Sequence, residues 1–251
     1  MFKYFFKREI KEKYIGNLTG FYWVIIQPLI LLTIYWVVFD KIFGSRYPES
    51  EEIGFIVYLA IGFWPWLAFS ESVIRSITVI SEKKDLVGKV NIDFKIPVIA
   101  TVSASFLLNM LGYIIVLVIL TIFNENIKFL SLPLILIPLL MLYIFSIGLG
   151  LFLSSINVFV KDTNQFMTTL MTVWFFMTPI IYPLSVIPIE YKTYIQLNPL
   201  SIPISFIHNA LITQNTLQWL NIGILYIIVI IFLYVSVKIF NKLSPSFDEF
   251  M

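Results

Sequence analysis

The chain has 251 residues, of which 59% are hydrophobic and 13% are charged, and its mean hydropathy is +0.91. These values lie far outside the range of a soluble globular domain and predict an integral membrane protein. The net charge is only +2, and the absence of cysteine excludes a disulfide framework, a thiolate metal site and a cysteine nucleophile. Because one span needs about 20 apolar residues to cross the bilayer, this length accommodates about six spans.

The N-terminal segment "MFKYFFKREIKEKYIG" is positively charged, as a signal peptide is. It contains no apolar core region and no small-residue cleavage site before Gly16, so we expect it to remain in the mature protein. Its apolar residues recur at a spacing of three to four: Phe2, Phe5, Phe6, Ile10 and Tyr14. The pattern predicts a helix over residues 2–14 that lies flat at the cytoplasmic interface.

Long runs with few charges predict the membrane-spanning segments. These spans are expected at about 20–43, 53–80, 96–123, 129–158, 164–183 and 216–238. The proline-containing segment at about 184–214 is predicted to be a re-entrant or interfacial element, acting either as an external gate or as an ordinary loop at the interface. The predicted fold class is an all-α membrane protein with a single transmembrane domain over residues 1–251.

Positive charges test this topology, since Lys and Arg in short loops partition to the cytoplasmic side. If both termini are cytoplasmic, thirteen Lys and Arg residues fall on the cytoplasmic side and four fall outside. A seventh crossing would move Lys238 and Lys242 to the outer side. The asymmetry therefore favours six spans with both termini in the cytoplasm.

Two polar segments interrupt the apolar runs on the predicted cytoplasmic side. Lys161 and Asp162, within "NVFVKDTNQF", are the only charges between Lys128 and Glu190, and the topology places them in a tight turn between the fourth and fifth spans. Either the two charges are simply the polar residues that any turn outside the membrane requires, or the turn receives force from a cytoplasmic partner. The same alternatives apply to "SEKKDLVGKVNIDFKIP", where two apolar residues lie among charges as in a short amphipathic helix.

Several segments occur in an order that is typical of one family. They read "KYIGNLTGFYWVIIQP", "YLAIGFWPWLAFSES", "KDLVGKVNIDFKIPVIA", "INVFVKDTNQF", "FFMTPIIYPLSVIP" and "NPLSIPISFIHNAL". Through them the chain resembles the permease subunit of type 2 ABC exporters, in the branch that exports polysaccharides and polyol phosphates such as O-antigen and teichoic acid. The chain departs from the family at Asn17 to Gly20, where a Ser-Val-Leu-Gly-like sequence is common, and at His208, where an Arg is common.

The resemblance implies a half-transporter of the cytoplasmic membrane of a bacterium or archaeon, which pairs with a second copy of itself and with two cytoplasmic ABC ATPase subunits. The residues that it implies for coupling to the ATPase are Lys84, Asp85, Leu86, Val87, Lys89, Lys161 and Asp162. The chain has no Gly-x-x-x-x-Gly-Lys loop, because "LVGKV" lacks the earlier glycine. We therefore expect no cofactor on this chain, ATP and Mg²⁺ on the partner, and no enzymatic activity here.

Aromatic residues near the middle of the spans are candidates to line a conduit for a sugar polymer. They are Tyr35, Phe39, Trp64, Trp66, Phe69, Trp174, Phe175 and Phe176. Ring faces could contact sugar C–H surfaces without binding any one sugar tightly, whereas a small ionic substrate would require buried charges. The alternative is that these rings only pack helices together.

Few ionisable residues lie within the spans. Glu71 and Arg75 stand four apart on one helical face and either pair with each other or leave Arg75 to meet a lipid-linked pyrophosphate. Arg8 on the N-terminal helix is a second candidate for contact with this head group, although anionic lipids also attract its charge. His208 is the only histidine, which excludes a histidine metal cluster and predicts a hydrogen-bonding role at the external surface.

The leading functional prediction is the transmembrane subunit of an ATP-driven exporter of a lipid-linked polysaccharide, with that glycopolymer and membrane lipids as partners and no nucleic acid. Export of teichoic acid, a lipid or a drug is the alternative within the same family. A membrane-embedded transferase acting on polyprenyl-linked sugars would need a cluster of acids, bases or metal ligands, and the spans offer only Glu71 as an acid. A structural anchor would show no nucleotide dependence.

Overall fold

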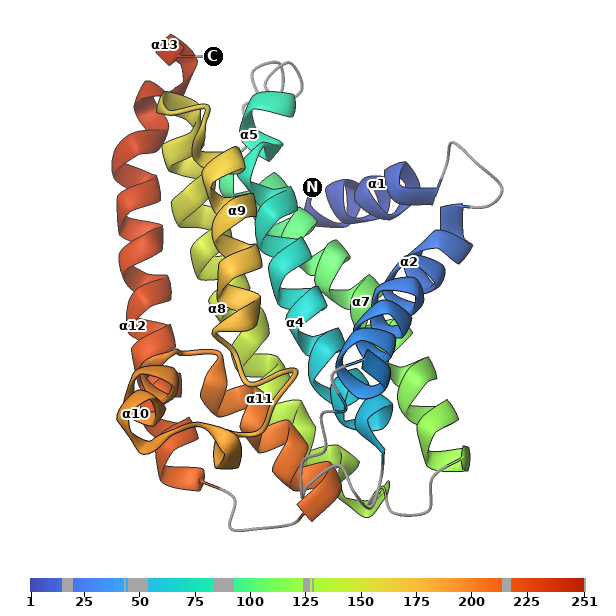
Figure 1. The fold of residues 1–251 in the computed structure, drawn as a ribbon. Coiled ribbons are helices and arrows are strands. Elements are labelled where there is room, and N and C mark those ends of the chain that lie inside the picture. The colour runs from blue at the N-terminus through green and yellow to red at the C-terminus, as the bar shows by residue number, and fades with distance from the viewer. Residues whose placement is uncertain are drawn as a thin grey trace.

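The computed structural model describes residues 1–14, 20–42, 44, 54–83, 93–123, 127, 129–213 and 218–250. These parts of the chain form helices joined by short connections and contain no strand. Helix α1 (Phe2–Tyr14) lies across one end of the bundle, and α2 (Gly20–Trp36) continues into the π-helix η1 (Val37–Ile42). Figure 1 shows α2 running obliquely away from the end that holds α1.

The remaining elements follow in chain order. They are α4 (Phe55–Ile77), α5 (Val79–Glu82), α7 (Lys95–Phe123), η2 (Phe129–Ser131), α8 (Leu132–Phe159), α9 (Thr163–Phe176), η3 (Leu184–Val186), α10 (Ile189–Leu197), α11 (Ser201–His208), η4 (Asn209–Thr213), α12 (Trp219–Leu243), η5 (Ser244–Ser246) and α13 (Phe247–Phe250).

Helix α4 is the centre of the bundle and packs against α2, α7, α8, α9 and α11. Nearly all of its side chains are buried, because five other helices pack against it and its small residues let their backbones approach. Gly150 on α8 illustrates this close approach, since a Cβ there would lie 2.8 Å from the Ser76 hydroxyl oxygen and 2.9 Å from a methyl group of Val102. The long helices α4, α7 and α8 therefore form one tightly packed unit.

Among the residues that the structure describes, four helices, α4, α7, α8 and α12, are long and apolar enough to cross a membrane, which indicates a multi-pass integral membrane protein. The outer face of α12 is mostly apolar, with Leu220, Ile224, Ile227 and Ile231 all exposed, as expected for contact with lipid. Helices α2 and α9, with 17 and 14 residues, are shorter. The expected count of six spans consequently remains a prediction.

The expected fifth span, at about 164–183, differs in length from the helix found there. Helix α9 ends at Phe176, and the chain turns through Thr178 and Pro179. A proline cannot donate the backbone hydrogen bond that would continue the helix, and it disfavours helical geometry in the residue before it. The helix therefore stops well before the apolar run does.

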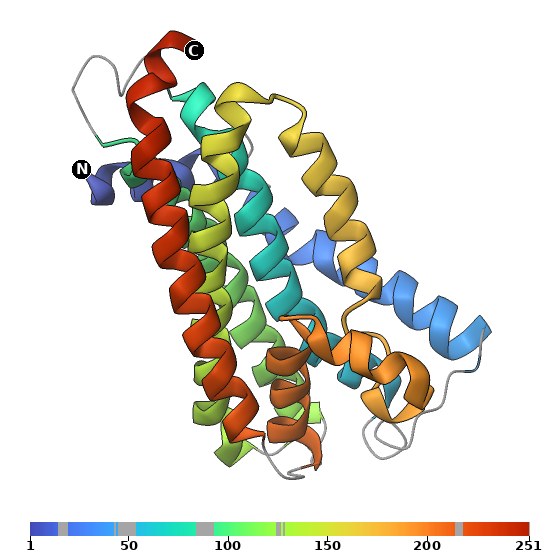
Figure 2. The same ribbon diagram turned by 90° about the vertical axis from the view of Figure 1, so that its left-hand side faces the viewer.

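Both termini, the end of α5 and the turn between α8 and α9 lie at one end of the bundle, whereas α10 and α11 lie at the other (Figures 1 and 2). The two views agree on this arrangement. The candidate sites therefore lie at two opposite ends of the bundle, one with the termini and the other with α10 and α11.

Candidate functional site

The turn between α8 and α9 presents Lys161 and Asp162 to the surface, and both side chains are exposed. Thr163 fixes the turn, because its backbone N–H and its hydroxyl both donate to the carbonyl oxygen of Val160, at 3.1 Å and 2.6 Å. Asp162 stands at the N-cap of α9, but its side chain makes no capping hydrogen bond. Its carboxylate gains only the general attraction of a helix N-terminus for negative charge and faces outward.

The other predicted coupling residues, Lys84, Asp85, Leu86, Val87 and Lys89, lie outside the described residues. The chain enters this segment from α5, at the same end of the bundle as the turn of Lys161 and Asp162 (Figure 1). Their part in coupling therefore stays a prediction.

A buried carboxylate ties α1 to the end of α4. Glu9 is 5% exposed and pairs with Arg75, whose Nη2 lies 3.4 Å from its Oε2, and with the Lys83 ammonium. Lys83 is 4% exposed, and its Nζ also lies 5.7 Å from the centre of the Phe5 ring. Because a buried charge is tolerated only when it is paired, this cluster fixes how α1 docks on the bundle.

Positive charge exceeds negative charge in this cluster. Burial and, to a smaller degree, the nearby Arg8 guanidinium lower the pKa of the Lys83 ammonium to about 8. With a pKa of about 8, Lys83 is still mostly protonated at neutral pH and can neutralise Glu9. Arg75 is only partly buried, so part of its charge reaches the surface at this end of the bundle, where Arg8 is also partly exposed.

Arg75 was expected either to pair with Glu71 or to meet a lipid head group. In the structure Arg75 bonds Glu9 of α1, and the Glu71 carboxylate accepts a hydrogen bond of 2.8 Å from the Asn109 side chain on α7. Both residues thus have partners on other helices. Sequence spacing shows only neighbours on the same helix, which is why Glu9 and Asn109 were not identified beforehand.

The predicted conduit aromatics gather into one cluster that joins α2, α4, α8 and α9. Phe175 of α9 stacks on Tyr35 of α2 at 5.3 Å between ring centres and lies 5.8 Å from Trp66 of α4. Phe69 stacks on Phe145 of α8 at 5.4 Å, and the edge of Trp174 meets Phe69 at 5.7 Å. Aromatic rings in these offset and edge-to-face arrangements hold the helices together.

Burial separates the eight candidates into two groups. Trp64, Trp66, Phe69 and Phe175 are enclosed by side chains of this same chain. Tyr35, Phe39 and Trp174 are partly exposed, and Phe176 is 49% exposed. Only the second group has ring surface that is exposed. A role in lining a conduit stays a prediction, and the exposed rings are the better candidates for it.

Asn198 is a functional candidate that the sequence did not single out. Its side-chain oxygen accepts hydrogen bonds from the Trp174 indole nitrogen at 2.8 Å and from the Leu200 backbone N–H at 3.0 Å. Its amide nitrogen donates to the Met177 carbonyl oxygen at 3.1 Å and to the Thr178 hydroxyl at 3.0 Å. One buried amide thus connects the end of α9 to the start of α11.

Helix α9 exposes a row of polar side chains that the sequence analysis did not identify. Gln165, Thr168, Thr169 and Thr172 are exposed along this helix. Apolar residues are exposed on it as well, namely Phe166, Leu170, Val173 and Phe176. The exposed surface of α9 is therefore mixed, with a hydroxyl row beside apolar side chains, whereas the exposed surface of α12 is mostly apolar.

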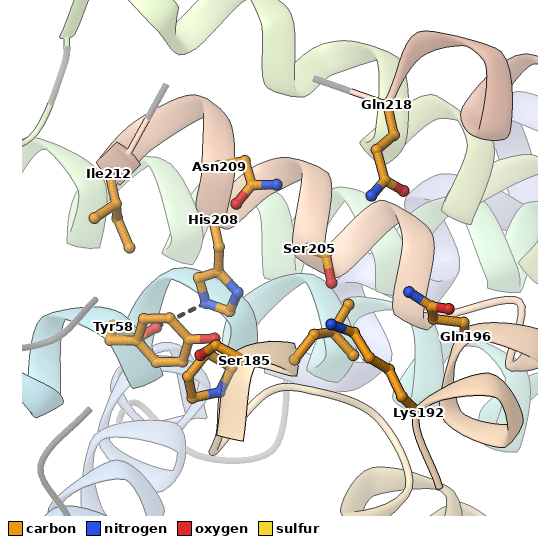
Figure 3. A pocket seen from close by; sticks show the side chains of 11 residues that line it. Tyr58, Ser185, Lys192, Gln196, Ser205, His208, Asn209, Ile212 and Gln218 are labelled. Atoms are coloured by element: carbon orange, nitrogen blue, oxygen red, sulfur yellow. Dashed lines mark hydrogen bonds between the residues drawn. The ribbon is translucent and has the colours of Figure 1, made fainter. Parts of the chain in front are cut away.

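A polar pocket of about 200 Å³ opens at the end of the bundle opposite the termini (Figure 3). His208 lines it and is 4% exposed. Its Nε2 lies 2.9 Å from the Tyr58 carbonyl oxygen, and its ring stacks on the Tyr58 ring at 4.0 Å. His208 lies outside the four long helices, and burial lowers its pKa to about 4, so the ring is neutral at neutral pH.

The ring of His208 packs against Gly62 of α4, which has no side chain. A Cβ at Gly62 would lie 2.8 Å from Cε1 of His208, so only glycine leaves room for the ring. The hydrogen-bonding role that the sequence analysis expected for His208 is therefore filled toward Tyr58.

Comparisons with known proteins agree on one type of transporter. The family model described as ABC-2 type transporter matches residues 1–212. The O-antigen export system permease protein RfbA of Klebsiella pneumoniae is 26% identical over 248 residues, which cover 97% of this chain and 92% of that protein. RfbA of Myxococcus xanthus is 28% identical over 187 residues, with 73% and 68% covered. The polysialic acid transport protein KpsM of Escherichia coli is 23% identical over 236 residues, with 94% and 90% covered.

Proposed function

The chain belongs to the ABC-2 type transporter family, and on this basis we propose that it is the transmembrane subunit of an ATP-driven exporter that moves a lipid-linked polysaccharide across the cytoplasmic membrane. The similarity to O-antigen export permeases over nearly the whole chain carries this proposal. Relatives named for polysialic acid transport support the same cargo class. Export of teichoic acid, a lipid or a drug is the alternative within the family.

Hydrolysis of ATP takes place on a separate partner in this proposal, with ATP and Mg²⁺ bound there. Two ATPase subunits contact the end of the bundle that holds α5 and the turn of Lys161 and Asp162, which is therefore the cytoplasmic end. Both termini lie at this end (Figure 1), as the positive-charge asymmetry requires. The segment of Lys84, Asp85, Leu86, Val87 and Lys89 supplies the second contact.

A second copy of the chain completes the transporter, with α2 and α9 crossing the membrane to bring the spans to six. The threonine row of α9 supports this pairing, because threonine is enriched where membrane helices pack against one another. Tyr35 and Phe176 flank this row on α2 and α9 and would line the path beside it. A polymer moving along such a path meets hydroxyls and ring faces but no fixed charge.

Coupling through the turn gives a direct test of the proposal. Replacing both Lys161 and Asp162 with alanine should lower glycolipid-stimulated ATP hydrolysis by about tenfold, the loss expected for about 1.4 kcal/mol of contact energy. The measurement uses the chain reconstituted with its partner ATPase. The matched control is Asp40→Ala with Lys41→Ala, because this adjacent ion pair lies on η1, toward the opposite end of the bundle.

The control variant should keep wild-type hydrolysis. Equal loss in both variants, or no loss in either, would contradict coupling through this turn. A reconstituted complex that shows no glycolipid-dependent hydrolysis even in the wild-type chain would contradict the exporter itself.

Arg8 and Arg75 form the proposed entry point for the lipid-linked pyrophosphate. Arg75 and Lys83 share one carboxylate, Glu9, and Arg8 acts electrostatically on Lys83, so cationic groups gather where the head group would arrive. Guanidinium groups bind phosphate oxygens through charge-assisted hydrogen bonds. Their position beside α1 agrees with entry from the cytoplasmic leaflet.

Replacing Arg8 and Arg75 together with glutamine should raise the glycolipid concentration for half-maximal stimulation of hydrolysis by about tenfold or more, since each charge-assisted bond contributes about 1.5–3 kcal/mol. The basal hydrolysis rate should not change. Lys7→Gln serves as control, because Lys7 is exposed on the same helix. A matching rise in Lys7→Gln would mean that general attraction to anionic lipid explains the effect.

A further inference from the structure

The pocket beside His208 is built from elements distant in sequence. Its walls come from Tyr58 of α4, from Ser185 of η3, from α10, and from Ser205 and His208 of α11 (Figure 3). Its volume of about 200 Å³ is below the range of about 300–1,000 Å³ that is common for pockets of drug-sized ligands. The space therefore suits one small unit rather than an oligomer.

Helix α10 presents two polar side chains to the pocket. Lys192 and Gln196 stand four residues apart, on one face of the helix, and both line the pocket. The remainder of the helix exposes the apolar residues Ile189, Tyr194 and Leu197 together with polar ones. Lys192 and Gln196 are therefore the groups through which α10 can contact a bound ligand.

Several polar groups around the pocket have no protein partner. In the described ranges no side-chain hydrogen bond or ion pair engages Ser185, Lys192, Gln196 or Ser205. Figure 3 shows Lys192, Gln196 and Ser205 placed around the same space. Together these side chains offer ammonium and amide donors, an amide acceptor and hydroxyls that both donate and accept.

The buried nitrogen of His208 adds an unfilled acceptor. The Tyr58 carbonyl can only accept, so Nε2 of His208 carries the proton, and Nδ1 of the neutral ring is an acceptor. Nδ1 is buried and lacks a hydrogen-bond partner within the part of the chain that the structure describes. An unpaired buried group is unfavourable, and a hydroxyl donor from a ligand would remove that cost.

Lys192 is the only charged residue that lines the pocket within the described ranges. A ligand with a single negative group would neutralise it through a charge-assisted hydrogen bond. Hydroxyls on the same ligand would meet the amides, the serines and Nδ1 of His208. A sugar acid carries this combination of groups on one ring.

We propose that this pocket binds a single acidic sugar unit, with its carboxylate on Lys192 and its hydroxyls toward Gln196, Ser205 and His208. The site lies at the end of the bundle opposite the termini (Figure 1), and it rests on the proposed function because that is the end where an exported glycopolymer emerges. It would receive the polymer's units as they leave the membrane.

The single histidine makes the site measurable in the intact chain. The full-length protein, purified without a histidine tag, is labelled with ¹⁵N-histidine and placed in lipid nanodiscs, so the ring signals report on His208 alone. D-glucuronate should shift the Nδ1 signal at concentrations about tenfold lower than D-glucose, because only the acid engages Lys192. Absence of a shift with either sugar, or equal potency of the two, would overturn the proposal.

Lys192→Gln should abolish the preference for glucuronate while leaving the glucose response in place. The matched control is Lys161→Gln at the opposite end of the bundle, which should keep the preference. An equal loss of the preference in both variants would overturn the assignment to Lys192. Glycolipid-dependent ATP hydrolysis of the reconstituted complex is measured in parallel. Hydrolysis without a sugar-dependent shift would contradict the pocket alone, whereas absence of glycolipid-dependent hydrolysis would contradict the proposed function.

Discussion

Replacing Glu9 with alanine is expected to lower the free energy of unfolding of the chain by about 3–5 kcal/mol, the cost of leaving a buried ion pair without one partner. Glu9 is the carboxylate that neutralises both Lys83 and Arg75. Lys83 is almost fully buried and loses its counter-charge in the variant, whereas Arg75 is partly exposed and can turn toward solvent. The loss should appear as a lower unfolding temperature of the purified chain.

Two further variants identify the cause of this loss. Lys7→Ala on the same helix should leave the unfolding temperature unchanged, since Lys7 is exposed. The double variant Glu9→Leu with Lys83→Met should recover most of the stability, because apolar side chains of similar size often replace a buried ion pair without cost. If the double variant is no more stable than Glu9→Ala, the docking of α1 depends on something other than this ion pair.

Asn198→Ala should be comparably damaging at the other end of the bundle. The change leaves the Trp174 indole N–H, the Leu200 N–H and the Met177 carbonyl without the partners that Asn198 provides. Each unsatisfied buried group costs about 1–3 kcal/mol, so a loss of about 3 kcal/mol or more is expected. The unfolding temperature and glycolipid-stimulated hydrolysis should fall together, since the end of α9 and the start of α11 lose their connection.

A graded series separates this connection from a general packing defect. Trp174→Phe removes one donor and should cost less than Asn198→Ala, and the two changes together should cost less than the sum of their separate effects. Asn221→Ala is the matched control, because Asn221 is exposed and, among the described residues, its side chain bonds the nearby Gln218 alone. Additive effects of Trp174→Phe and Asn198→Ala would contradict a shared hydrogen-bond network.

The long helices could be predicted from the sequence because each is an apolar run with a length set by the bilayer. The helix over residues 2–14 followed from periodicity alone, and the structure contains a helix with these bounds. The ends of α2 and α9 were less predictable. In α9, Pro179 marks a break that the sequence shows, but the apolar run continues beyond it, so the span expected from hydropathy extends to about 183 whereas the helix ends at Phe176.

The partners of the site residues could not be predicted, because they lie far apart in sequence. Spacing paired Arg75 with Glu71, whereas Glu9, 66 residues before Arg75, approaches only when α1 docks on the bundle. The Asx turn from Asn198 to the Leu200 N–H is a local pattern that a sequence can indicate. The bond from Asn198 to Trp174 depends on how α9 meets α11, and no local rule contains that information.

The threonine row of α9 has a consequence for the speed of polymer movement. Each hydroxyl hydrogen is already donated to a carbonyl one turn back in the same helix, from Thr168 to Asn164, from Thr169 to Gln165 and from Thr172 to Thr168. In the proposed path these groups therefore offer passing sugars only acceptor lone pairs, over about 6 Å of the helix from Thr168 to Thr172. Hydroxyls that can only accept hold a sugar less firmly than hydroxyls that also donate, so this short stretch favours movement of the polymer over tight binding.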